Sequence, residues 1–180
     1  MIKALAITVS NRAAAGVYED RSGPVLVDLL RAAGCDTVSG PLVVPDGEPV
    51  LAALRGALTG EFDVVVTTGG TGLTPMDQTP EMTREVIDRE IPGLAEAIRS
   101  AGAAAGVASA VLSRGVAGLA GTTLIVNLPG SSGGVRDGMA VLGPVLAHAV
   151  DQARGGDPAA GKFIRASSCN RLALHLASAR

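Results

Sequence analysis

The sequence predicts an α/β fold built on a mainly parallel sheet that helices cover on both faces. Short apolar runs suited to buried strands alternate with longer segments whose apolar residues recur at helical spacing. This repeated strand and helix order implies right-handed crossovers between parallel strands. One hairpin near residue 121 adds a single antiparallel strand. At 180 residues the chain is long enough to form one domain with a sizeable core.

The elements of the first half follow directly from their residues. The continuous apolar run at 2–9 is typical of a strand buried on both faces, and apolar residues at helical spacing indicate a helix over 25–33. We expect a second strand over 36–44 and a second helix over 50–58. The β-branched run at 64–66 suits a buried central strand.

The elements of the second half alternate less regularly. Segments 113–120 and 122–128 meet at Gly121, which predicts a hairpin and therefore an antiparallel pair. Pro144 lies inside the last helical pattern and is expected to bend or divide that helix. We expect three helices here: one over 81–89, one that begins at Pro92 and one over 135–150.

The composition changes at residue 155, which divides the chain into a domain at 1–154 and a tail at 155–180. Gly155-Gly156-Asp157-Pro158 is typical of a linker. Beyond it the chain carries four basic side chains and no acid. We expect the tail to serve surface or subunit contacts rather than chemistry.

Composition and charge exclude several classes of function. A net charge of −2 and the presence of only one Tyr, two Phe and no Trp argue against a nucleic-acid partner. Cys35 and Cys169 are isolated in the sequence, which fits a reduced compartment better than a disulfide scaffold. No apolar run approaches the roughly 18 residues that a bilayer span needs, and the first ten residues are too short for a signal peptide. We therefore expect a cytoplasmic protein without a membrane partner.

The densest cluster of candidate site residues lies between Asp63 and Glu81, in the sequence D-V-V-V-T-T-G-G-T-G-L-T-P-M-D-Q-T-P-E. The strand is followed by a loop over 68–77 with three glycines, Gly69, Gly70 and Gly72, which we call the glycine loop. Thr79 with Pro80 is typical of a helix start. Glycines let a ligand approach the backbone, and free N–H groups at a helix start favour an anion beside Asp77. This arrangement predicts an anion site that contains an acid. A tight turn with a solvated Asp is the structural alternative.

A second acid is expected at the same place. In a parallel sheet, the loops that follow the carboxyl ends of the strands share one edge, where ligands bind. These loops are 10–22, 45–47, 68–77 and 129–134. Asp46 and Asp77 should therefore share one rim, where two carboxylates could hold Mg²⁺ against the phosphates of a nucleotide or another phosphorylated substrate. Pro45-Asp46-Gly47 is equally an ordinary turn sequence.

The segment Gly130-Ser131-Ser132-Gly133-Gly134 formally matches the G-x-S-x-G elbow of hydrolases. A serine triad would need an Asp and then a His on later strands, but only a helix and the tail follow. We expect instead that the loop presents N–H and hydroxyl groups to a second phosphate or an oxyanion, and a plain glycine-rich turn is the alternative. Nearby arginines could pair with phosphate or be solvated: Arg12, Arg21 and Arg136.

Several of these segments together resemble the molybdopterin-binding Mog/MoaB family of molybdenum-cofactor biosynthesis. The matching segments are Thr67 to Gly72, Asp77-x-Thr79-Pro80-Glu81, Asn127 to Ser131, Val9-Ser10-x-Arg12, Asp20 to Pro24 and Val44-Pro45-Asp46. The resemblance covers about residues 2–152 and leaves the tail unexplained. It implies a three-layer α/β/α fold, a homotrimer, and transfer of the adenylyl group of Mg-ATP to molybdopterin with release of pyrophosphate.

The resemblance also implies roles for individual residues. Asp46 and Asp77 match acids linked to catalysis and, with ATP, to Mg²⁺. The positions that match pterin or nucleotide contacts are Ser10, Asp20, Ser22, Thr68, Gly69, Gly70, Thr71, Gly72, Pro129, Gly130 and Ser131. Three residues depart from the usual pattern: Met76 replaces a commonly basic residue, Asn11 a common Asp and Ser132 a common Pro.

Other functions fit the same residues. A pterin-binding member without transfer activity, or one that acts in a related step such as molybdate insertion, is the main alternative. The molybdate-insertion enzyme is then a further partner to consider. A purely structural oligomer is a third possibility, which predicts that no ligand binds.

Overall fold

The computed structural model describes residues 1–156, and residues 157–180 lie outside the description. The boundary expected at residue 154 therefore stays a prediction, and the tail expected at 155–180 lies almost wholly outside the described residues. Within residues 1–156, no helix combines the length and the apolar character that a bilayer crossing requires.

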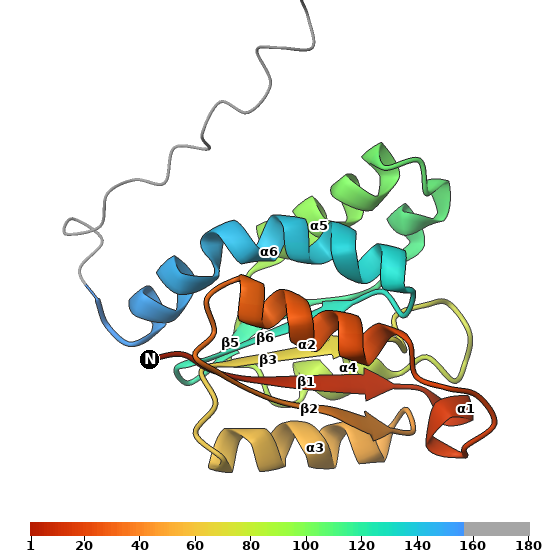
Figure 1. The fold of residues 1–180 in the computed structure, drawn as a ribbon, viewed down its shortest axis with the longest axis horizontal. Coiled ribbons are helices and arrows are strands. Elements are labelled where there is room, and N and C mark those ends of the chain that lie inside the picture. The colour runs from red at the N-terminus through yellow and green to blue at the C-terminus, as the bar shows by residue number, and fades with distance from the viewer. Residues whose placement is uncertain (157–180) are drawn as a thin grey trace, which may run out of the picture.

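One six-stranded sheet forms the centre of the protein, with the strand order β2-β1-β3-β6-β5-β4 (Figure 1). Strands β2, β1, β3 and β6 run parallel, β5 is antiparallel to β6, and β4 is antiparallel to β5. A single strand, β5, thus runs against the others, which confirms the predicted fold class. The strands span Lys3–Val9 (β1), Thr37–Val44 (β2), Val64–Thr68 (β3), Arg89–Glu90 (β4), Ala117–Ala120 (β5) and Thr123–Leu128 (β6).

Helices cover both faces of the sheet, as alternating side chains on the strands require (Figure 1). On one face, Ala6, Val66 and Val126 pack with apolar residues of α2, α5 and α6. On the other, Ile7 and Val65 pack with α3 and with residues in and just after α4. The helices span Asn11–Ala14 (α1), Ser22–Ala32 (α2), Glu48–Thr59 (α3), Thr79–Arg84 (α4), Pro92–Ala104 (α5) and Ser132–Ala153 (α6), with a 3-10 helix at Ala108–Leu112 (η1).

Two sequence-based boundaries differ from the structure. The helix expected over 81–89 ends at Arg84, because Asp88 N donates to Leu119 O and the chain joins the sheet as β4. The strand expected from residue 113 begins at Ala117, because Arg114 N donates to Thr71 O and holds this segment against the glycine loop. Helix α6 is not divided at Pro144.

The thiol of Cys35 supplies a pH-dependent part of the stability. Cys35 is 6% exposed at the end of α2. Burial, and then the negative charges of Asp36 and Asp63, raise the pKa of this thiol from 9.0 to about 11. The folded state therefore disfavours the thiolate more than the unfolded state does.

We expect the free energy of unfolding to fall by about 2 to 3 kcal/mol as the pH rises from about 9 to about 11. The contribution of the Cys35 thiol to the free energy of unfolding is fully present below the pKa that the thiol has in the unfolded state. It is lost as the pH rises through the pKa that the thiol has in the folded state. Urea unfolding of the unaltered protein and of Cys35→Ala at several pH values measures it. Equal slopes against pH in the two proteins would contradict the assignment.

Candidate functional site

Three loops meet at the carboxyl edge of the sheet, at the ends of β1, β3 and β6. Gly69 N donates to Leu128 O at 3.1 Å, and Thr68 Oγ1 donates to Pro129 O at 2.8 Å. Gly69 has a φ of +104°, and a Cβ there would overlap Val9 O. Only glycine suits this position, since it alone combines the left-handed backbone with so close an approach.

Asp46 ties the end of β2 to the start of α4. Its Oδ1 accepts hydrogen bonds from Gly47 N at 2.7 Å and Thr79 Oγ1 at 3.1 Å, and its Oδ2 accepts one from Gln78 N at 3.1 Å. Thr79, expected as the helix cap, is instead the first residue of α4. A carboxylate at the start of a helix accepts otherwise unpaired N–H groups, so Asp46 contributes to fixing the glycine loop before any ligand binds.

Asp77 is held within its own turn. Its Oδ2 accepts hydrogen bonds from Thr74 N at 3.0 Å and Thr74 Oγ1 at 2.6 Å, whereas its Oδ1 accepts none from the described residues. The carboxylate faces Gly72, where a Cβ would lie 2.8 Å from Oδ2. Asp77 is half-buried and keeps one oxygen available.

The two acids line one cavity of about 280 Å³, which we call the acidic pocket. Asp46 and Asp77 come from loops 31 positions apart and nevertheless share this rim, as parallel strand ends predict. The pocket is lined by Val9, Ser10, Asn11, Arg12, Asp46, Gly70, Thr74, Met76 and Asp77.

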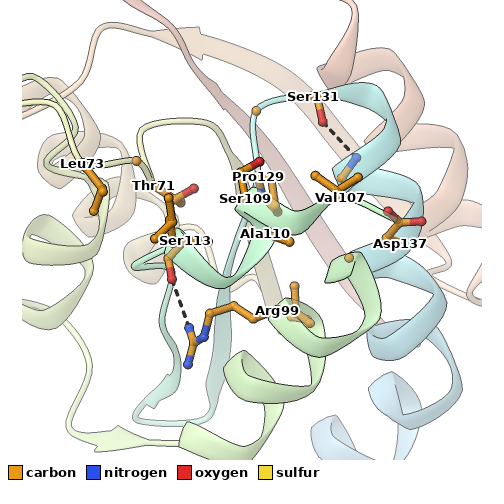
Figure 2. Close-up of a pocket in the computed structure, with 16 residues that line it drawn as sticks. Thr71, Leu73, Arg99, Val107, Ser109, Ala110, Ser113, Pro129, Ser131 and Asp137 are labelled. Atoms are coloured by element: carbon orange, nitrogen blue, oxygen red, sulfur yellow. Dashed lines mark hydrogen bonds between the residues drawn. The ribbon is translucent and has the colours of Figure 1, made fainter. Parts of the chain in front are cut away.

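A larger cavity of about 520 Å³, which we call the apolar cavity, adjoins the same loop (Figure 2). Gly70 lines the acidic pocket, whereas the next two residues, Thr71 and Gly72, line the apolar cavity. The lining also includes Pro129 to Ser131 and the apolar residues Ile98, Val107, Ala110 and Leu112. Asp137 and Arg99 are the charged residues of the lining. A cavity of this size and character suits a small ring ligand.

Not every predicted contact residue lines a cavity. Asp20 Oδ1 accepts hydrogen bonds from Ser22 N and Gly23 N, both at 3.0 Å, and so stabilises the start of α2. Its Oδ2 accepts one from Thr8 Oγ1 of β1 at 2.7 Å. Neither Asp20 nor Ser22 lines the acidic pocket or the apolar cavity. Ser10 lines the acidic pocket and also caps α1, by accepting from Ala13 N at 3.2 Å.

Thr68 and Gly69 act in the packing of the loops and line neither cavity. Ser131 lines the apolar cavity and caps α6, by accepting from Gly134 N at 3.0 Å. Pro129 and Gly130 line the same cavity. The contact roles of all these residues with a ligand stay predictions.

Arg114 holds the glycine loop and was missed by the sequence reasoning. Its Nε donates to Gly72 O at 2.7 Å, and its guanidinium also donates to Asp77 O and to the Glu81 carboxylate. Its backbone N donates to Thr71 O at 2.9 Å. The sequence signal that could have indicated this role is a basic residue directly before the predicted hairpin, in Ser113-Arg114-Gly115.

Asn127 is a second residue that was not assigned a role. It is 3% exposed, in the middle of the sheet. Its Nδ2 donates to Thr67 Oγ1 and Thr83 Oγ1, both at 3.0 Å, and its Oδ1 accepts from Val116 N at 3.2 Å. Because a buried amide is costly unless it is hydrogen-bonded, these contacts link β3, β6 and α4 in one arrangement.

The donor set fits a magnesium ion that arrives with phosphates. Among the described residues, no group of three or more His, Cys, Asp or Glu side chains could hold a metal ion by itself. Mg²⁺ commonly uses one or two carboxylates and completes its shell with water and substrate phosphates. Asp46 and Asp77 are the two carboxylates that would hold such an ion, and water and substrate phosphates would fill the remaining positions.

The fold and these cavities define an α/β domain with a small-molecule site at the carboxyl edge of its sheet. The sequence also matches the family described as "Probable molybdopterin binding domain" over residues 5–148. The chain belongs to this family.

Relatives and solved structures agree with that assignment. The molybdopterin adenylyltransferase of Helicobacter pylori is 34% identical over 152 residues, which cover 81% of this chain and 84% of that protein. The Mog protein of Mycobacterium ulcerans has a structure that is 52% identical and superposes with a TM-score of 0.80, covering 85% of this chain and 99% of that one. MoaB of Thermus thermophilus is 41% identical with a TM-score of 0.76, covering 86% and 98%.

Some relatives are much longer. A molybdenum cofactor biosynthesis bifunctional protein of Synechococcus elongatus is 36% identical over 154 residues, which cover 86% of this chain and 48% of that protein. The chain thus spans about half the length of that relative. It spans 24% of the cinnamon protein of Drosophila melanogaster.

Gly70 offers a test of the loop geometry. Its φ is +65°, and a Cβ would overlap Thr79 Oγ1 and Asp46 Oδ2. Gly121 has a similar φ of +59° with open space around it. We expect Gly121→Ala to lower the free energy of unfolding by about 1 kcal/mol, the cost of a left-handed alanine. Gly70→Ala should cost at least about 2 kcal/mol more, because Asp46 must move.

Urea unfolding of both variants measures the difference. Gly121→Ala serves as the control for backbone strain, since it shares the conformation and lacks the overlap. Equal losses of unfolding free energy in the two variants would show that Asp46 and Thr79 can move away from the added Cβ without destabilising the protein.

Proposed function

We propose that this protein transfers the adenylyl group of Mg-ATP to molybdopterin and releases pyrophosphate, in the biosynthesis of the molybdenum cofactor. The name of the Helicobacter pylori relative, a molybdopterin adenylyltransferase that the chain matches over most of its length, supports this activity. The family description supports molybdopterin as the ligand.

One observation carries the proposal: Asp46 and Asp77 line a single pocket against the glycine loop. Two carboxylates beside backbone N–H groups favour a ligand that combines a divalent cation with phosphates. The adjoining apolar cavity has room for a ring system. The glycine loop borders both, so a phosphate that extends from the ring would reach the acids.

The chemistry requires no covalent enzyme intermediate. A phosphate oxygen of molybdopterin bonds to the α-phosphorus of ATP, and the bond from that phosphorus to the bridging oxygen breaks as pyrophosphate leaves. The protein's contribution is to place the two reactants in line and to exclude water. Asp46 and Asp77 would hold Mg²⁺, which neutralises charge on the phosphates.

A binding protein without transfer activity is the alternative that the site leaves open. Met76 lines the acidic pocket and brings no positive charge to a phosphate. The molybdate-insertion enzyme would then be the expected partner. We place either activity in the cytoplasm.

Replacing Asp77 by Asn tests the role of the acid. Asn can keep the hydrogen bonds from Thr74 through one oxygen, because the other position of the carboxylate accepts none from the described residues. We expect Asp77→Asn to keep the fold and to reduce turnover at least about tenfold, or roughly 1.4 kcal/mol in the barrier. Pyrophosphate release from molybdopterin and Mg-ATP measures turnover.

Asp28→Asn is the matched control, since Asp28 lies on the exposed face of α2 and, within residues 1–156, pairs with Arg31 alone. It should release pyrophosphate at the unaltered rate. Full turnover in Asp77→Asn would remove this acid from the mechanism. Binding of molybdopterin without pyrophosphate release by the unaltered protein would favour the binding alternative.

We also propose that the protein is a homotrimer. Exposed apolar side chains that line neither cavity support association, namely Leu42, Val111 and Val145. Light scattering on the full chain should give three times its mass of 17.9 kDa. A monomer mass at micromolar concentration would reject the trimer.

A further inference from the structure

The arginines of the described residues fall into two groups. Seven of the ten bind a carboxylate or a backbone carbonyl: Arg31, Arg55, Arg84, Arg89, Arg99, Arg114 and Arg154. Within residues 1–156, the side chains of the other three form no hydrogen bond or ion pair; they are Arg12, Arg21 and Arg136. Of these three, only Arg12 lines the acidic pocket.

Arg12 is also the only cationic residue of that pocket's lining in the described part of the chain. Within residues 1–156 it forms no hydrogen bond or ion pair with the two acids of the pocket, whose hydrogen bonds there come from uncharged donors. Asp46 accepts from Gly47 N, Gln78 N and Thr79 Oγ1, and Asp77 accepts from Thr74. The guanidinium is therefore available to a negatively charged ligand.

The contact that Arg12 does make is a weak one. Its guanidinium lies over the ring of Tyr18, 5.6 Å from the ring centroid. Val17 N donates to Arg12 O at 2.9 Å, and this turn brings Tyr18 back beside the arginine. Both side chains are exposed, where a cation–π contact is weak, whereas a guanidinium can bind phosphate through two charge-assisted hydrogen bonds. A phosphate should therefore displace the ring.

We propose that Arg12 binds the terminal phosphates of the nucleotide and stabilises the pyrophosphate that leaves. This inference rests on the proposed adenylyl transfer. As the bond between the α-phosphorus and the bridging oxygen breaks, its electron pair stays on pyrophosphate, and the fixed charge of Arg12 offsets the added negative charge. Because the pterin phosphate attacks as an anion, Arg12 neither gives nor takes a proton.

The chain provides its own reporter for this contact. Tyr18 is the single tyrosine, and there is no tryptophan. Intrinsic fluorescence excited in the tyrosine band therefore reports on Tyr18 alone. Inorganic pyrophosphate with Mg²⁺ is the suitable probe, since it lacks a base that absorbs in this range. We expect the fluorescence to change with saturation as Arg12 leaves the ring.

Calorimetric titration with Mg-pyrophosphate should show that Arg12→Gln binds at least about tenfold more weakly than the unaltered protein. Arg12→Lys should lose less, since it keeps the charge but not the two-point contact. Arg31→Gln is the control, because Arg31 lies on α2 and pairs with Asp28. It should bind pyrophosphate normally. Thermal unfolding should be the same in unaltered protein and in Arg12→Gln, because the lost guanidinium forms no hydrogen bond with residues 1–156 and its contact with Tyr18 is exposed and weak.

Unchanged affinity in Arg12→Gln, or an equal loss in Arg31→Gln, would overturn the inference. So would the absence of pyrophosphate binding by the unaltered protein. The proposed function fails by a different measurement, namely no pyrophosphate release from molybdopterin and Mg-ATP. Pyrophosphate binding needs no pterin, so the two failures are distinguishable.

Discussion

The close approach of three backbone segments at Gly69 is the constraint on which the site depends. The ends of β1, β3 and β6 can converge only where a side chain is absent, since a Cβ at Gly69 would overlap Val9 O. The Cα of Gly69 lies 3.2 Å from where a Cβ of Gly130 would be. This contact holds the glycine loop against the loop after β6, and both cavities form at its border. Stability and site geometry are thus set by the same residues.

Two charged residues fix the glycine loop. Asp46 accepts from Gln78 and Thr79 at the start of α4, while Arg114 donates to the carbonyls of Gly72 and Asp77. The loop therefore keeps its shape through protein contacts. A phosphate bound by its remaining N–H groups, as proposed, would meet a loop that protein contacts already hold, and such preorganisation lowers the cost of binding.

The sequence was sufficient to predict the parallel sheet, the reversed strand and the shared rim of Asp46 and Asp77, because strand ends meet by topology. It was not sufficient for Arg114, whose partner Gly72 is 42 positions away and comes from a different loop. Strand β4 has two residues and no pattern of its own, so only its pairing with β5 defines it. Asp20 matched a ligand contact by resemblance, and the sequence alone did not indicate that its Oδ1 binds the start of α2 and its Oδ2 binds Thr8 of β1.

The two acids of the pocket are not equivalent. Both carboxylate oxygens of Asp46 accept hydrogen bonds, from Gly47 and from Gln78 and Thr79 at the start of α4. Asp77 accepts from Thr74 through one oxygen, and its other oxygen has no donor among the described residues. A cation that enters the pocket would find an open position on Asp77 first. Reaching Asp46 requires sharing an oxygen that already accepts a hydrogen bond. For the proposed Mg²⁺ site, this geometry favours Asp77 as the primary ligand and Asp46 as the residue that sets the distance between the loops.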